Sequence, residues 1–181
     1  MNKTIIGKLL IALLIGIFLC CAYVIPWKST TTMDERTYLE MTLGILRTGL
    51  PLVENGPIDQ FPMLKTEWNL SRDGRLWGIY APGYPYVMAP ILAMFGTEGM
   101  VRANFFFMAL MALGVFMLAR EALGQADLPA AATAWIATVS APVWANAFGI
   151  SSYTLAIATV PWAFWALLRS HNSNVSCARN L

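Results

Sequence analysis

The sequence predicts an all-α integral membrane protein with about five transmembrane helices and one long polar loop outside the membrane. Hydrophobic residues make up 57% of the 181 positions and charged residues only 12%, roughly half the charged share of a soluble domain. Seven of the ten acidic and six of the twelve basic residues fall between positions 28 and 78. This segregation suits a bilayer, because an unpaired charge in its core costs several kcal/mol.

Residues 1–27 are predicted to hold the first transmembrane helix. The stretch 5–25 is apolar except for Lys8, and at about 1.5 Å per residue it can cross a hydrocarbon core of about 30 Å. Lys3 and Lys8 predict a cytoplasmic N-terminus. A cleaved signal peptide is the alternative, but the apolar stretch is long for one and has no small-x-small cleavage site.

The segment 79–168 is predicted to form the rest of the transmembrane bundle. Its first span contains three prolines, so regular helix should begin near Gly83. If all five spans cross, Arg120 and Arg169 lie outside, against the positive-inside rule. The polar tail 169–181 lacks helical periodicity and is expected to be irregular. The four spans expected here are 79–96, 103–119, 128–147 and 151–168.

The external loop, residues 28–78, is predicted to carry an amphipathic helix over 33–48. Thr32 followed by Glu35 is a capping box that starts a helix. Gly49 ends it, with Arg47 in the last turn. Because its apolar residues recur at helical spacing, this helix is expected to lie flat on the membrane surface.

A short hairpin is predicted near the end of the same loop. Asp73-Gly74 is a two-residue turn signal flanked by apolar residues, and the simplest interpretation of Asp73 is a turn residue. The hairpin leads into the proline-rich segment 81–85. Tyr80 and Tyr84 suit an interfacial aromatic belt, and they would equally suit a groove for a lipid-linked sugar.

Asp34 and Glu35 lie in the first turn of the expected helix, where the helix dipole favours negative charge. The plain interpretation is a pair of helix-start acids. The functional alternative is a carboxylate at the water side of a membrane cavity, acting as a general base or a cation ligand. The sequence has no zinc-type ligand pattern and implies no cofactor, leaving a divalent metal open. It has no basic run that would indicate nucleic-acid binding.

Two segments carry a family resemblance, MDERTYLEMTLGILRTGLPLVENGP and DGRLWGIYAPGYPYVMAPILAMFG. They resemble the start of the GT-C membrane glycosyltransferases, most of all the bacterial branch related to protein O-mannosyltransferases and lipid A aminoarabinose transferases. In that family an Asp-Glu pair opens a short helix in the first external loop, and a proline-rich segment starts the second span. The matching positions here are Asp34, Glu35, Tyr38, Gly49, the segment 82–85 and Arg102.

The resemblance implies a polyprenyl-phosphate sugar as donor and the first-loop aspartate as general base. Carried over, Asp34 is the base and Glu35 its neighbour. Arg102 is the candidate cation facing the leaving phosphate. The resemblance also implies a bacterial inner membrane with the loop 28–78 external, membrane lipid and the sugar donor as partners, and no identified protein partner. The further candidate substrate-binding residues are Tyr80, Tyr84 and Asp73.

Members of that family are much longer, so the resemblance predicts an N-terminal portion that lacks the later helices of the donor site. The alternative is a non-catalytic membrane protein, a truncated remnant or an assembly partner, in which Asp34 caps a helix with no cavity beside it. A small transporter subunit ranks last, because Lys8 is the only ionisable group within a span.

Overall fold

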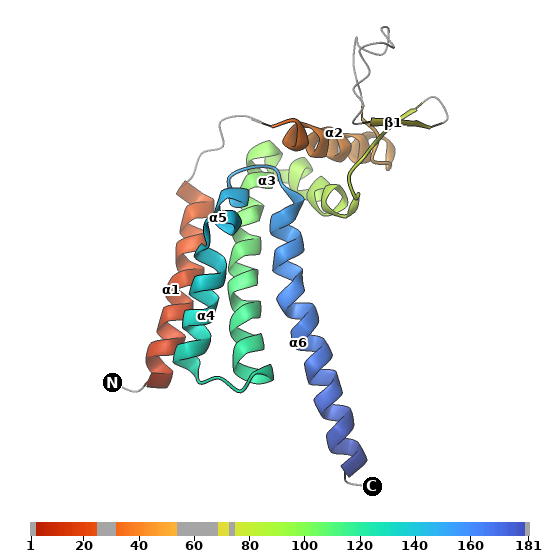
Figure 1. The fold of residues 1–181 in the computed structure, drawn as a ribbon. Coiled ribbons are helices and arrows are strands. Elements are labelled where there is room, and N and C mark those ends of the chain that lie inside the picture. The colour runs from red at the N-terminus through yellow and green to blue at the C-terminus, as the bar shows by residue number, and fades with distance from the viewer. Residues whose placement is uncertain (1–2, 25–31, 54–68, 73–74, 180–181) are drawn as a thin grey trace. The chain divides into compact units, whose positions relative to one another are not determined.

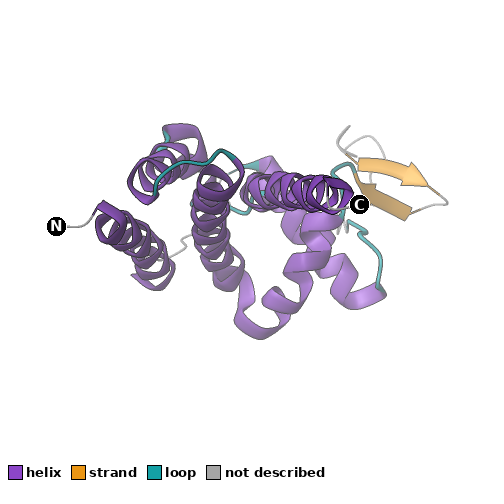
Figure 2. Cartoon of the chain, turned by 90° about the horizontal axis from the view of Figure 1, so that it is seen from below, coloured by secondary structure: helices purple, strands orange, loops and turns teal. Residues whose placement is uncertain are grey.

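The computed structural model describes residues 3–24, 32–53, 69–72 and 75–179. The described chain is mostly helical, as predicted (Figure 1), and its two named strands form one hairpin (Figure 2). It divides into two compact units that are described separately. The helical unit comprises Met1–Ile25, Asn104–Phe148 and Tyr153–Leu181, and the loop unit comprises Pro26–Ala103 and Gly149–Ser152.

In the loop unit, helix α2 (Met33–Thr48) has the predicted bounds. Thr32 is the N-cap, and its side chain and that of Glu35 form the capping box in both directions. Gly49 ends the helix with a left-handed φ of 77°, a conformation that glycine adopts without the cost of a Cβ. Local sequence signals alone therefore define this helix.

The predicted hairpin is confirmed as strands β1 (Asn69–Arg72) and β2 (Arg75–Gly78), which pair antiparallel. The turn residues Asp73 and Gly74 lie outside the described residues. On its other edge β2 is joined by the segment after α2: Val53 N donates to Leu76 O at 3.0 Å, and Gly78 N to Pro51 O at 3.2 Å. A small core of buried Met41, Val53 and Leu76 fixes α2 against these strands.

Helix α3 (Gly83–Met117) begins at the predicted residue and consists of two helical stretches that meet at Gly96. Gly96, with φ 67° and ψ −170°, is not helical, and a single glycine can turn the chain there without a connecting loop. The break coincides with the end of the expected span 79–96, whereas residues 97–102, expected to separate it from the span 103–119, are helical. The helix continues into a π-helical turn, η3 (Leu118–Ala122).

In the helical unit, α1 (Lys3–Val24) runs in the same direction as α4 (Asp127–Val139) and α5 (Ala141–Ala147), since successive residues of α1 contact successive residues of these helices. A Cβ on Gly7 would collide with the backbone of Asp127, so the two helices meet closely at that level. Farther along, the Trp135 indole donates to Leu10 O at 3.0 Å. The facing surface of α4 is made of fully buried alanines, the small residues that let helices approach in lipid.

The second part of α3 and α6 (Ser152–Arg179) run in the other direction. The indole of Trp162 donates to Leu110 O at 3.0 Å, and that of Trp165 to Glu121 Oε2 at 2.9 Å. Phe105 packs edge-on against Phe148 with ring centroids 5.4 Å apart. The helices of this unit therefore lie side by side, and their direction alternates in chain order rather than between every pair of neighbours (Figure 1).

The expectation of about five membrane spans is not met. Within the described residues, two helical stretches are long and apolar enough to cross a membrane, Lys3–Val24 and Gly83–Ala122. The expected span 128–147 is divided into α4 and α5, of 13 and 7 residues, because Ser140 is extended with ψ 139°. The tail 169–181 was expected to be irregular, but α6 continues to Arg179.

Candidate functional site

Asp34 lies exposed in the first turn of α2, where its carboxylate meets the chain entering α3. The hydroxyl of Tyr80, two residues after β2, donates to Asp34 Oδ1 at 2.5 Å. An exposed carboxylate that is oriented by one short hydrogen bond has the geometry to accept a proton from a bound hydroxyl group.

Aromatic side chains surround this contact within the loop unit. The rings of Tyr38 and Tyr80 stack with centroids 4.8 Å apart, and Tyr84 meets Tyr38 edge-on at 5.3 Å. Tyr38 and Tyr84 are buried, at 7% and 3% exposure, while Tyr80 is half-buried. Stacked rings of this kind hold an aromatic side chain rigidly and present an apolar face beside the carboxylate.

Glu35 has a different environment from its neighbour. It is buried at 8% exposure, and its carboxylate accepts from the amides of Thr32 at 3.1 Å and Ile150 at 3.2 Å. A Cβ on Gly149 would collide with Glu35 Oε1. Glu35 therefore joins the start of α2 to the segment Gly149–Ser152, and its geometry is that of a positioning residue rather than a proton acceptor.

A second contact holds the same segment to α2. The hydroxyls of Tyr38 and Ser152 lie 2.7 Å apart, one turn along the helix from Glu35. From the sequence, Ser152 is only a residue of the expected span 151–168, and Tyr38 is only a position of the family resemblance. No local signal could have paired them, since 114 positions separate them.

Arg102 and Asp73 are not brought to this cluster by the described contacts. Arg102 is on α3, where Nη2 donates to Glu98 Oε1 at 2.6 Å and the side chain is 44% exposed. Asp73 lies outside the described residues. The structure thus gathers Asp34, Tyr80 and Tyr84 of the sequence-derived candidates, and it adds Tyr38 and Ser152.

Across the described part of the chain, no group of three or more histidine, cysteine, aspartate or glutamate side chains could hold a metal ion. The acidic neighbours Asp34 and Glu35 point to different partners, Tyr80 in one case and backbone amides in the other. The chemistry available at Asp34 is therefore that of a single carboxylate and aromatic hydroxyls.

Comparison with known proteins assigns no family and no function to the chain. No protein-family model matches the chain, and no curated protein or solved structure matches it either. Function is therefore inferred from the residues and their contacts.

Proposed function

We propose that the chain is a membrane glycosyltransferase of the GT-C type, or the N-terminal portion of one, which transfers a sugar from a polyprenyl-phosphate donor to an acceptor on the external face. The observation that carries the proposal is the exposed Asp34 carboxylate, hydrogen-bonded by Tyr80 at 2.5 Å beside stacked aromatic rings. These residues belong to the two segments that resemble that family.

In this proposal Asp34 takes the proton of the acceptor hydroxyl while the acceptor oxygen attacks the anomeric carbon. The bond from that carbon to the donor phosphate breaks, and the polyprenyl phosphate leaves with the bonding electron pair. Tyr80 orients the carboxylate, and Glu35 holds the helix turn that bears it. Tyr84 supports the aromatic cluster, and Arg102 remains the candidate counter-charge for the phosphate.

We further propose that the helical unit crosses the membrane four times. Together α4 and α5, with 13 and 7 residues on either side of Ser140, are about as long as the twenty residues needed for one crossing. The outward face of α1 supports contact with lipid: its leucines Leu9 and Leu13 are 60% and 55% exposed. Exposed apolar residues in such a row are unusual on a soluble protein.

The orientation follows from the charges of the helical unit. Its described charged side chains gather at one end, which is called the charged end below. Gly7, near Lys3 and Lys8, meets Asp127 there. Two ion pairs lie at the same end, Asp127 with Arg120 and Glu121 with Arg169. Four basic and two acidic residues make this end positive, and the positive-inside rule favours the cytoplasm for it. Four crossings therefore remove the conflict that arose for Arg120 and Arg169 with five.

In this proposal the site lies at the external face of the bacterial inner membrane. The chain enters the described helix α2 after leaving α1 at Val24, and α1 starts at the charged end. The loop 28–78 is then external, where a flipped polyprenyl-phosphate sugar and its acceptor would meet.

Transfer of sugar is the direct test. Membranes containing the full chain should move radiolabelled sugar from a panel of polyprenyl-phosphate monosaccharides into an acceptor fraction, and matched membranes without the chain should not. Label at the background level for every donor would contradict the glycosyltransferase proposal and favour a non-catalytic membrane protein, in which Asp34 serves only as a helix-start acid.

A further inference from the structure

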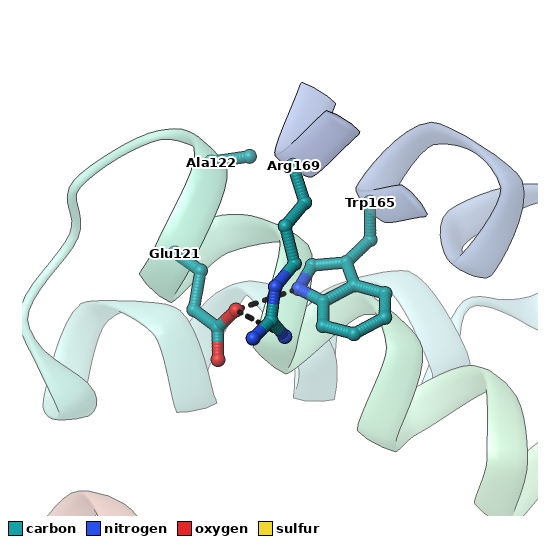
Figure 3. Close-up of a pocket in the computed structure, with 4 residues that line it drawn as sticks. All are labelled: Glu121, Ala122, Trp165 and Arg169. Atoms are coloured by element: carbon teal, nitrogen blue, oxygen red, sulfur yellow. Dashed lines mark hydrogen bonds and ion pairs between the residues drawn. The ribbon is translucent and has the colours of Figure 1, made fainter. Parts of the chain in front are cut away.

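A small pocket of about 140 Å³ lies at the charged end, lined by Glu121, Ala122, Trp165 and Arg169 (Figure 3). Glu121 belongs to η3, and the tryptophan and arginine lie one turn apart on α6. The Trp165 indole donates to Glu121 Oε2 at 2.9 Å, and the Arg169 guanidinium lies 5.1 Å from the centre of the Trp165 ring. The pocket therefore combines an anion, a cation and an aromatic face.

These groups do not satisfy one another fully. The Arg169 Nη1 to Glu121 Oε2 separation is 3.8 Å, and the two side chains are 67% and 38% exposed, so the ion pair contributes little to stability. The indole and the guanidinium both approach Oε2, and Oε1 has no partner among the described residues. The carboxylate and the guanidinium can each accept a further ligand group of opposite charge.

We propose that this pocket binds the phosphoethanolamine headgroup of a membrane phospholipid. The headgroup carries an ammonium and a phosphate a few bonds apart, which matches a carboxylate beside a guanidinium. The ammonium donates to Glu121 Oε1, the phosphate accepts from Arg169, and the two methylene groups between them lie against the Trp165 ring. A guanidinium can bond a phosphate through two N–H groups at once.

The surroundings favour a lipid over a soluble phosphate ester. Tryptophan and arginine are typical of the membrane interface, and exposed apolar side chains flank the pocket in sequence: Leu123 at 64%, Phe164 at 54% and Leu167 at 65% exposure. These side chains can contact acyl chains. The inference rests on the proposed membrane placement of the charged end and does not depend on sugar transfer, so a failed transfer assay leaves it intact.

Headgroup selectivity tests the proposal. The full chain, purified in detergent and stripped of lipid, is mixed with equal amounts of phosphatidylethanolamine, phosphatidylglycerol and phosphatidylcholine bearing identical acyl chains, and bound lipid is counted by native mass spectrometry. We expect phosphatidylethanolamine to exceed each of the others about fivefold, the effect of one charge-assisted hydrogen bond at a partly exposed site. Equal retention of the three lipids would overturn the proposal.

Paired variants separate the two contacts. Glu121→Gln keeps an acceptor for the Trp165 indole but loses the charge, so the preference over phosphatidylglycerol should disappear. Arg169→Gln should lower retention of all three lipids. Glu40→Gln and Arg36→Gln are matched controls, since they break an ion pair of 2.7 Å whose residues do not line the pocket, and they should leave the preference unchanged. A preference that survives Glu121→Gln, together with lipid retention that Arg169→Gln leaves unchanged, would exclude this pocket.

A soluble competitor identifies the source of the headgroup. Free O-phosphoethanolamine in large excess should not displace the bound phospholipid, because it lacks the acyl chains that the flanking apolar residues contact. Complete displacement would mean that the pocket takes a soluble phosphate ester, and it would overturn the lipid assignment.

Discussion

Replacing Asp34 by asparagine should reduce sugar transfer by about a hundredfold or more, the usual contribution of a positioned general base. Asparagine retains an oxygen that accepts the Tyr80 hydroxyl, which donates to Asp34 at 2.5 Å, and it is tolerated in a first helical turn. The change therefore removes proton acceptance while leaving α2 in place. Initial rates of label transfer at saturating donor, measured on membranes with equal amounts of each chain, give the comparison.

Two companion variants make this result specific. Tyr80→Phe removes only the hydroxyl that orients the carboxylate, so a smaller loss of about tenfold is expected from one hydrogen bond. Glu40→Gln removes an acidic group of the same helix that pairs with Arg36 and should leave the rate unchanged. Equal transfer by wild type and Asp34→Asn would eliminate Asp34 as the base.

Glu35→Ala is expected to have the largest effect on stability in the loop unit. Its carboxylate accepts from the amides of Thr32 and Ile150, and its removal leaves buried donors unpaired and one helix cap incomplete. Together these losses should lower the free energy of unfolding by about 3 kcal/mol. Thermal unfolding in detergent reports the loss, and hydrogen exchange at the Ile150 amide should become markedly faster.

The glutamine variant tests whether both carboxylate oxygens are needed. Thr32 N donates to Oε2 and Ile150 N to Oε1, and glutamine offers a single acceptor oxygen, so Glu35→Gln should recover only part of the stability that Glu35→Ala loses. Gly149→Ala should mimic Glu35→Ala, because its Cβ would displace the Glu35 carboxylate. Unchanged exchange at Ile150 in both Glu35→Ala and Gly149→Ala would show that Glu35 does not hold the segment Gly149–Ser152.

The elements predicted correctly from the sequence are those whose signals are local. Thr32, Glu35 and Gly49 delimit α2 by hydrogen bonds within a few residues, and the Asp73-Gly74 pair indicates a hairpin whose strands are then found on either side of it. The sequence indicated Gly83 as the start of α3 because Pro82 directly precedes it and Pro85 lies in the first turn. Each of these features depends on backbone chemistry that adjacent residues determine.

The remaining features depend on contacts that the sequence does not reveal. Hydropathy alone could not show that helix resumes directly after Gly96, or that Ser140 divides the span 128–147. The Tyr80–Asp34 bond links positions 46 apart, and the Glu35–Ile150 bond links positions 115 apart. The sequence therefore indicated Asp34 and Tyr80 as two separate candidates, and the tertiary structure shows that a hydrogen bond links them. The hydrogen bond from Ile150 to Glu35 likewise indicates a positioning role that the sequence did not reveal.

The most direct test of the central claim is to measure on which side of the membrane helix α2 and the charged end lie. Single cysteines replace Arg36 on α2, whose side chain is 70% exposed, and the exposed Ala126 beside the charged end, in a chain whose native cysteines are changed to serine. In intact cells a membrane-impermeant maleimide should label Arg36→Cys at once, and Ala126→Cys only after permeabilisation. Labelling of Ala126→Cys in intact cells, or protection of Arg36→Cys, would contradict four crossings with the Asp34 site on the external face.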